Sequence, residues 1–463
     1  TIRNLWEGEH SARRFGPKMR IGYIPDPFGH IGQMPQILQG FGISSACVQR
    51  GLSDEPCEFL WQSPDGSQVL MAYLRDGYGN AASLQTANDE LFASEVRRLR
   101  DNLRPHSSAE HLLLMLGTDH MEPPLDTSRA IKNSQENLDG DLLLHSSLTD
   151  YMTAIQDTLD RDKLQVVQGE LRDCKRSHLL PGVLSTRMWI KQRNRASENI
   201  LERWAEPFST FDRLVDQDPS GSMLKAPEDF LHQAWRLLME NHPHDSICGC
   251  SIDQVHEEMK ARFDQVDQIG EEITRLSLDQ LAGSIDAGEM PALVAFNPTT
   301  QTRCDLLDAT TETGSSFDLV DEQGNAIPYQ ILGLGSQELI HADLKPEELK
   351  ALVANVPDGQ VMGMKIIDLR TERRGNIIHL KAVVTEQGEA NLHAWRAGVS
   401  AIEEWIRDPS IENIHVVALS ADKTRIRFSA EVPGLGWRVF NLKPRPSEGI
   451  APIKISPLTR FLI

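Results

Sequence analysis

The stretch Tyr23-Ile24-Pro25-Asp26-Pro27-Phe28-Gly29-His30 holds one carboxylate in a stiff turn at the end of an apolar run. Residues 19–24 predict a short buried strand, and the two prolines restrict the backbone on both sides of Asp26. Open α/β sheets and α/β barrels carry their catalytic groups just beyond such strand ends. A turn in which Asp26 hydrogen-bonds its own backbone explains the same residues, so this stretch alone leaves both interpretations open.

The composition excludes several classes of protein. A length of 463 residues predicts roughly two to four domains, and 40% hydrophobic with 25% charged residues is typical of a soluble globular chain. The formal net charge of -20 argues against binding to nucleic acid, which needs a basic surface. No apolar run is long enough for a membrane span. The six cysteines indicate a reducing, cytoplasmic compartment, with Cys248 and Cys250 as buried free thiols.

The pattern of the chain predicts a multidomain fold with three regions. Residues 1–183 alternate apolar runs, such as 69–74 and 112–116, with helical stretches, which is typical of a partial parallel α/β barrel. Residues 184–288 show three successive amphipathic patterns and predict a three-helix bundle. Residues 289–463 contain short strand-like runs between turn residues and predict an all-β, sandwich-rich region.

A second carboxylate follows one of these apolar runs. Gly117-Thr118-Asp119-His120 comes directly after residues 112–116, which predict a buried strand. Two carboxylates at strand ends of one sheet would meet the need of a glycosidase, in which one attacks or stabilises the sugar and the other protonates the leaving oxygen. Taken alone, Asp119 is better explained as a helix cap or turn residue.

The segment Asn241-His242-Pro243-His244-Asp245 ends the second predicted helix of the bundle. Imidazole and carboxylate groups are common ligands of zinc, so this cluster is a candidate metal site. The alternative is a polar helix end, where histidine is favoured by the helix dipole.

These segments resemble glycoside hydrolase family 38, the α-mannosidases. The turn around Asp26, the Gly117-Thr118-Asp119-His120 segment, and His244-Asp245 followed by Gly249 occur in the order seen in that family. Further similar segments lie at 184–187, 295–298 and 433–437, so the resemblance spans nearly the whole chain.

The resemblance implies a role for each candidate residue. Asp26 would be both the nucleophile and a zinc ligand, and His244 would be a second zinc ligand. Asp119 would be the acid/base, and Asp245 would bind sugar hydroxyls. Arg50, in Val48-Gln49-Arg50-Gly51, resembles an arginine that steadies the sugar and the nucleophile, although a surface ion pair explains it equally well.

One departure from the family concerns the metal. Members carry an N-terminal His-x-His-x-Asp segment that supplies two further zinc ligands, and this sequence has no such segment. Both ends of the chain look truncated. With Asp26 and His244 alone, we expect weak zinc binding.

The sequence therefore predicts that the intact protein is a zinc-dependent retaining α-mannosidase that acts on a mannoside or a mannose-containing oligosaccharide. The carboxyl groups of Asp26 and Asp119 should lie about 5 Å apart, as a direct nucleophile requires. The group attached to mannose stays open, and the resemblance favours a homo-oligomer. A metal-dependent polysaccharide deacetylase and an inactive carbohydrate-binding fragment are the alternatives.

Overall fold

The computed structural model describes residues 1–215, 226–312, 317–354, 356–361, 363–385, 389–421 and 423–445. The chain divides into two compact units, of which the first holds Thr1–Glu206 and Leu224–Arg275 and the second holds the remaining described residues. The predicted order of an α/β region, a helical region and a β-rich region is confirmed. The predicted boundaries of three domains stay a prediction.

A five-stranded sheet lies at the centre of the α/β region, in the order β1-β2-β4-β3-β5. Strands β1, β2 and β4 are parallel, whereas β3 runs antiparallel to β4 and parallel to β5. The prediction of a partial parallel barrel is therefore corrected, because the described strands form an open mixed sheet. The strands are β1 (Ile21–Ile24), β2 (Ser45–Val48), β3 (Glu58–Gln62), β4 (Gln68–Tyr73) and β5 (Val166–Gln168).

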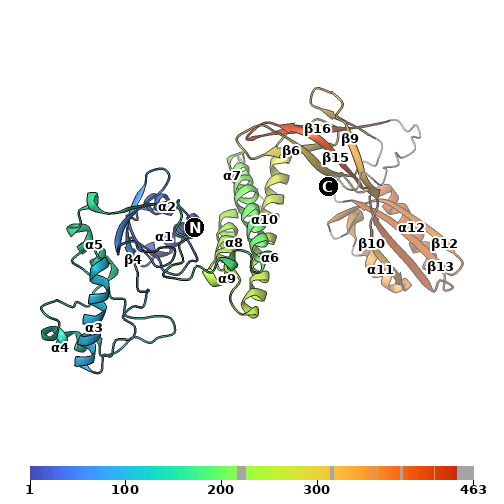
Figure 1. Ribbon diagram of the computed structural model, residues 1–463. Coiled ribbons are helices and arrows are strands. Elements are labelled where there is room, and N and C mark those ends of the chain that lie inside the picture. Colours follow the sequence, from blue (N-terminus) through green and yellow to red (C-terminus); the bar gives the residue numbers. More distant parts are fainter. Residues whose placement is uncertain are drawn as a thin grey trace. The chain divides into compact units, whose positions relative to one another are not determined.

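Both faces of this sheet are covered (Figure 1). Neighbouring residues of β4 face opposite sides of the sheet, as in any strand. Met71 packs into the hydrophobic cluster on one face, and Leu70 packs into the cluster on the other. Helix α2 (Met34–Gly40) packs on the first face and α5 (Leu148–Thr158) on the second. This double burial explains why residues 69–74 form a continuous apolar run.

Residues 112–116, predicted to be a buried strand, form no strand in the described structure. Their apolar side chains do pack into two hydrophobic clusters. The backbone, however, pairs with the loop after β4: the Met115 N–H donates to Asn80 Oδ1 at 2.7 Å, and its carbonyl accepts from the Ala81 N–H at 3.0 Å. An extended segment beside a loop has no ladder of hydrogen bonds, so the strand prediction is wrong.

The predicted helical region packs around one hydrophobic cluster that includes Ile190, Trp235 and Phe263. Figure 1 shows α6, α8 and α10 side by side in this region. The helices of the first unit besides α2 and α5 are α1 (Ile2–Arg13), α3 (Asp89–Leu103), α4 (Thr127–Ser134), α6 (Met188–Asn199), α8 (Pro227–Met239) and α9 (His244–Cys248). Helices α7 (Glu206–Val215) and α10 (Asp253–Gly283) cross the boundary between the units.

The second unit contains one five-stranded sheet, β10-β14-β13-β12-β11, and two three-stranded sheets, β7-β15-β9 and β6-β16-β8. All strand pairs in these sheets are antiparallel except β13 with β14. The strands are β6 (Ala292–Asn297), β7 (Arg303–Thr311), β8 (Phe317–Asp321), β9 (Tyr329–Gly335), β10 (Glu338–Leu344), β11 (Gln360–Val361), β12 (Met364–Arg374), β13 (Ile377–Thr385), β14 (Asn413–Ser420), β15 (Lys423–Val432) and β16 (Gly436–Pro444).

The prediction of an all-β C-terminal region is corrected by two helices. Helices α11 (Pro346–Ala354) and α12 (Leu392–Trp405) contribute Leu349 and Ile402 to the hydrophobic cluster on one face of the five-stranded sheet. Figure 1 shows both helices beside that sheet. By the alternation of β13 and β14, its other face carries both polar side chains, such as His379 and His415, and apolar ones, such as Val383 and Val417.

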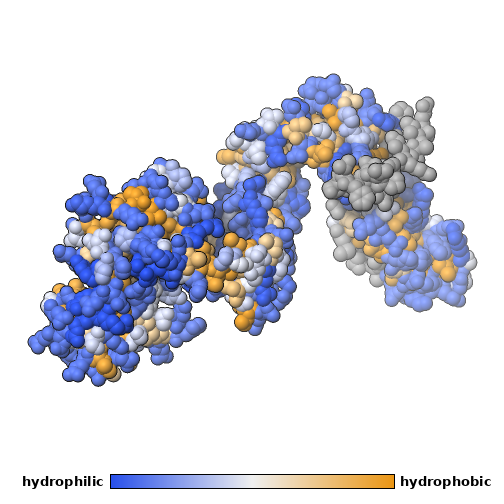
Figure 2. All heavy atoms as spheres, in the orientation of Figure 1, coloured by the Kyte–Doolittle hydropathy of each residue, from blue (hydrophilic) through white to orange (hydrophobic). Residues whose placement is uncertain are grey.

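The described helices all lack the combination of length and apolarity that a membrane crossing requires. Figure 2 shows mostly hydrophilic residues on the visible surface around α3 and α5. Both observations agree with the polar composition of the chain.

Gly51 offers a test of the close packing beneath the sheet edge. Gly51 (φ +92°) and Gly66 (φ +90°) share a left-handed backbone, but a Cβ atom on Gly51 would lie 2.5 Å from the Leu171 carbonyl oxygen, whereas one on Gly66 meets nothing within 4 Å. We expect Gly66→Ala to lower the free energy of unfolding by about 1–2 kcal/mol, and Gly51→Ala by at least about 2 kcal/mol more. Urea unfolding measures both, and equal losses would contradict the packing described.

Candidate active site

Two charged side chains meet at the carboxyl edge of the sheet. Ile24 and Val48 are paired in neighbouring parallel strands, and Asp26 and Arg50 each follow two residues later. Arg50 Nε donates to Asp26 Oδ1 at 2.6 Å, and its Nη2 pairs with the same oxygen. Both side chains are more than four-fifths buried, at 17% and 19% exposure, so this contact is not the surface ion pair that the sequence left open.

A second partner of Asp26 comes from the helical region. The short helix α9 begins at His244, directly after Pro243. His244 Nε2 lies 3.0 Å from Asp26 Oδ2 and 3.7 Å from Asp245 Oδ1. The structure thus brings Asp26, Arg50, His244 and Asp245 together, although almost 200 residues of sequence separate the first two from the last two.

Phe28 packs between the two partners of Asp26. Its ring meets the His244 ring edge-on, with centroids 5.7 Å apart, and the Arg50 guanidinium carbon lies 5.3 Å from its centroid. An aromatic ring in this position excludes water from one side of the ion pair and restricts the rotamers of both partners. Phe28 lies in the turn around Asp26, but the sequence pattern alone predicted no role for it.

Tyr78 connects Asp119 to the same edge of the sheet. Its hydroxyl donates to Asp119 Oδ2 at 2.8 Å, and its backbone N–H donates to Gln49 Oε1 at 3.0 Å. The hydrogen bond to Asp119, burial and the negative charge of Asp26 raise the pKa of Tyr78 to about 12. The phenol therefore stays protonated at neutral pH and acts as a donor.

Tyr78 was not among the predicted site residues, because a lone tyrosine between two glycines carries no chemical signal of its own. Gly79 is the neighbouring residue that could have indicated a role for this loop. A Cβ atom there would lie 2.8 Å from the Gly117 carbonyl oxygen, so the loop after β4 must approach the Asp119 segment closely. Asp119 itself is exposed, and the prediction that it ends a strand is wrong.

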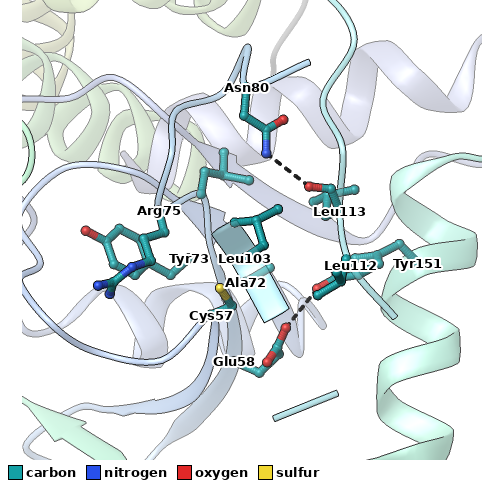
Figure 3. A pocket seen from close by; sticks show the side chains of 11 residues that line it. Cys57, Glu58, Ala72, Tyr73, Arg75, Asn80, Leu103, Leu112, Leu113 and Tyr151 are labelled. Atoms are coloured by element: carbon teal, nitrogen blue, oxygen red, sulfur yellow. Dashed lines mark hydrogen bonds between the residues drawn. The ribbon is translucent and has the colours of Figure 1, made fainter. Parts of the chain in front are cut away.

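A small cavity behind this loop shows how the Asp119 segment is held (Figure 3). The Asn80 amide points across the cavity and donates to the Leu113 carbonyl oxygen at 3.2 Å. At the other end, the buried Glu58 carboxylate accepts from the Tyr151 hydroxyl at 3.1 Å. The Asn80 contacts anchor the backbone of the segment at Leu113 and Met115, while Asp119 is exposed.

The chemistry of Asp26 and His244 suits zinc only in part. Their nearest oxygen and nitrogen atoms lie 3.0 Å apart, a separation that two ligands of one zinc ion can have. Across the part of the chain that the structure describes, however, no three His, Cys, Asp or Glu side chains are arranged to hold a metal ion. Zinc sites in proteins use three or four protein ligands, so these two residues do not complete one.

The burial of Cys248, the last residue of α9, and of Cys250 differs from the prediction. Cys250 is exposed rather than buried, and its thiol lies 3.2 Å from Asp245 Oδ1, while Cys248 is half-buried. Gly249, with φ of +81°, turns the chain between them and places Cys250 at the surface. Both thiols are free, as predicted.

His30 connects two segments of the site. It lies in the turn that contains Asp26 and contacts the loop that contains Arg50. Its ring is only 4% exposed, meets Trp61 edge-on and hydrogen-bonds the Arg50 backbone. Burial lowers the pKa of His30 to about 4. Its Nε2 atom has no hydrogen-bond partner, so a proton there would be buried without compensation.

We expect this histidine to make the fold sensitive to acid. Below the ordinary pKa of about 6.5 the unfolded chain binds a proton at His30, whereas the folded chain does so only near pH 4. The contribution of neutral, buried His30 to the free energy of unfolding is therefore complete above pH 6.5. It decreases by up to about 3 kcal/mol as the pH falls to 4. In His30→Gln this part of the pH dependence should disappear from the unfolding free energy. The exposed His111→Gln is the control, and an unchanged pH slope in His30→Gln would contradict the assignment.

Two family models match the chain. The model described as "Glycosyl hydrolases family 38 N-terminal domain" matches residues 1–170, and "Alpha mannosidase middle domain" matches residues 178–281. Asp26, Arg50 and Asp119 lie within the first match, and His244 and Asp245 within the second.

The chain is also similar to individual proteins. It is 38% identical over 283 residues to a putative mannosylglycerate hydrolase of Halalkalibacterium halodurans, which covers 58% of this chain and 30% of that protein. It is 27% identical over 297 residues to alpha-mannosidase 2C1 of Homo sapiens, which covers 62% of this chain and 26% of that protein. The chain thus spans less than a third of the length of either relative.

One solved structure extends the likeness to the whole fold. A crystal structure of an alpha-mannosidase from Enterococcus faecalis V583 superimposes with a TM-score of 0.72 over 97% of this chain and 46% of that one. The two sequences are 22% identical, so this likeness supports the fold alone.

Proposed function

Because the chain belongs to glycosyl hydrolase family 38, we propose that it carries the nucleophile and the acid/base of a retaining α-mannosidase. The observation that supports this most directly is the position of Asp26. Its two oxygens face different partners, Arg50 on Oδ1 and His244 on Oδ2, at the edge of the sheet. A carboxylate held in this way cannot rotate freely, which is what an in-line attack on a sugar carbon requires.

The first step is the attack of Asp26 on the anomeric carbon of mannose. Arg50 fixes Oδ1 and, through Phe28, is itself fixed in place. The oxygen that faces His244 is then the one that forms the bond to the sugar. Asp245 lies beside His244 with an exposed carboxylate that can accept hydrogen bonds from sugar hydroxyls.

Asp119 supplies the proton to the departing oxygen and later removes one from the attacking water. The Tyr78 hydroxyl orients its Oδ2, which leaves Oδ1 for the substrate. Two displacements of this kind retain the configuration at the anomeric carbon. The carboxyl separation of about 5 Å expected from the sequence stays a prediction, and an inverting enzyme would need about 6.5–9.5 Å.

Zinc is part of the same proposal. Asp26 and His244 would hold it, and at least one further ligand would have to come from outside the described residues. A zinc ion in this place would bind and polarise hydroxyls of the mannose. The roles of Arg50, Tyr78 and Asp119 above do not depend on it.

The names of the relatives suggest a substrate class. A putative mannosylglycerate hydrolase and an α-mannosidase share the mannosyl group and differ in what is attached to it. We therefore propose a mannoside substrate and leave the second group unspecified. The cytoplasmic location and the homo-oligomer stay predictions of the sequence.

Covalent trapping tests the nucleophile. We expect a 5-fluoro-mannosyl fluoride to label the protein that contains this chain on one peptide, the one with Asp26, because the fluorine slows hydrolysis of the intermediate. Asp26→Ala should take no label, and Asp65→Ala, in an exposed turn, should be labelled like the parent. Mass spectrometry of the digested protein measures this. Label on another residue, or β-mannose as the first product by NMR, would refute the proposal.

The same experiment separates an enzyme from a binding module. The described residues supply only two zinc ligands, which favours the inactive carbohydrate-binding fragment as the second candidate. That candidate is supported if the parent and Asp26→Asn bind a mannoside equally well by calorimetry while neither is labelled or hydrolyses it.

Tyr78→Phe tests the positioning of the acid. Loss of the hydrogen bond to Asp119 should lower kcat by about 10–100-fold, the equivalent of about 1.4–2.7 kcal/mol, with little change in KM. The loss should be larger for a mannoside with an alkyl leaving group than for 4-nitrophenyl mannoside, because a good leaving group needs little protonation. Steady-state kinetics on both substrates measure the ratio. Equal losses on both would assign Tyr78 a merely structural role.

A further inference from the structure

Helix α9 carries His244 and Asp245, but it is too short to be stable by itself. It has five residues, none of which is fully buried, and Ile247 packs against the hydrophobic cluster of the helical region. The first turn of a helix costs more free energy than its few hydrogen bonds contribute, so a helix this short needs support. The position of α9 is therefore set by contacts with other elements.

Two cationic side chains at the start of α6 bind the end of α9. Lys191 Nζ donates to the Cys248 carbonyl oxygen at 2.9 Å and to the Thr186 carbonyl oxygen at 2.5 Å. Arg187 Nε donates to the Gly249 carbonyl oxygen at 3.2 Å. The last carbonyl groups of a helix have no partner within it and carry partial negative charge, so cationic donors stabilise this end.

A third residue of the α6 segment holds the chain just before α9. Asn194 Oδ1 lies 2.7 Å from Nε2 of His242, two residues before His244. Lys191 and Asn194 are three residues apart, so they lie on one face of α6. This face therefore contacts the chain on both sides of the two residues assigned to the candidate active site.

The turn after α9 also packs closely against the start of α6. A Cβ atom on Gly249 would lie 3.1 Å from the Thr186 carbonyl oxygen and 3.2 Å from the Arg187 Cβ atom. Backbone packing and hydrogen bonds thus act together at this end of α9. Its other end reaches Asp26 through His244, at 3.0 Å.

We propose that Lys191, supported by Arg187 and Asn194, is a positioning residue of the candidate active site, an assignment that rests on the proposed function. Lys191 acts through α9. While the end of the helix is fixed, His244 keeps its contact with Asp26 Oδ2, and Asp245 stays beside it for the sugar hydroxyls. Without the ammonium group two carbonyl oxygens lose their donor, so α9 opens locally more often.

Hydrogen exchange followed by mass spectrometry tests the support of α9 without any activity. In Lys191→Met, we expect the amides of residues 244–250 to exchange about 10–100-fold faster, while those of β4 exchange as in the parent. Lys191→Arg keeps a cationic donor and should stay close to the parent. Arg195→Met, an exposed residue of α6 paired with Glu198, is the control. Unchanged exchange at residues 244–250 in Lys191→Met would overturn the assignment.

The rate of covalent labelling tests the effect on the nucleophile in the protein that contains this chain. A 5-fluoro-mannosyl fluoride should label Asp26 about 10–100-fold more slowly in Lys191→Met, because His244 no longer holds the attacking carboxylate. The final extent of labelling should stay complete. A merely structural Lys191 would instead lower the extent, through loss of folded protein, and leave the rate constant unchanged. Lys191→Arg should recover most of the rate.

The outcomes separate this assignment from the proposed function. If the parent takes no label on Asp26, the proposed function fails and the positioning role fails with it. If the parent is labelled and Lys191→Met reacts at the parent rate, the positioning role alone is overturned. Should circular dichroism show that Lys191→Met is unfolded, Asn194→Ala takes its place, with an expected loss in labelling rate of about 3–10-fold. Labelling of that variant at the parent rate would equally overturn the assignment.

Discussion

The contact of Asp26 with Arg50 and His244 is the constraint on which the α/β region depends. It joins the turn after β1, the loop after β2 and the first residue of α9, with donor–acceptor distances of 2.6 and 3.0 Å. Charges that are mostly buried are stable only when each has its partner, and removal of one partner leaves the other uncompensated. Some of the atoms that link the sheet to the helical region of the first unit are therefore those that face the substrate in the proposed reaction. Arg3 of α1 also reaches the helical region, through Glu206 and Trp235.

The parts of this site that the sequence predicted are those with local causes. Pro25 and Pro27 fix the turn around Asp26 by themselves, and the run at 69–74 is apolar because both of its faces are covered. Tyr78 was missed because its role depends on where the segment at 112–119 lies. That segment was misassigned because an apolar run reports burial of side chains and not the partner of its backbone.

In the second unit, too, the features that depend on contacts between distant segments were not predicted. Strand-like runs from 293 onward were recognised, but α11 and α12 lie between them and cover one face of a sheet that a sandwich would cover with strands. The ring contacts of His415 with His341 and with His379 have no signature in the sequence either. The parallel register of β13 with β14 and the antiparallel register of β10 with β14 bring these residues together.

The turn that carries Asp26 has a consequence for solubility as well. Strand β1 is an outer strand of the described open sheet, and its Tyr23 is 46% exposed. Outer strands of this kind readily pair with other chains and so start aggregation. Pro25 and Pro27 cannot donate backbone hydrogen bonds, so any foreign strand that docks on β1 finds only four residues to pair with before the ladder stops. The stiffness that aims the carboxylate thus also limits self-association of the polypeptide.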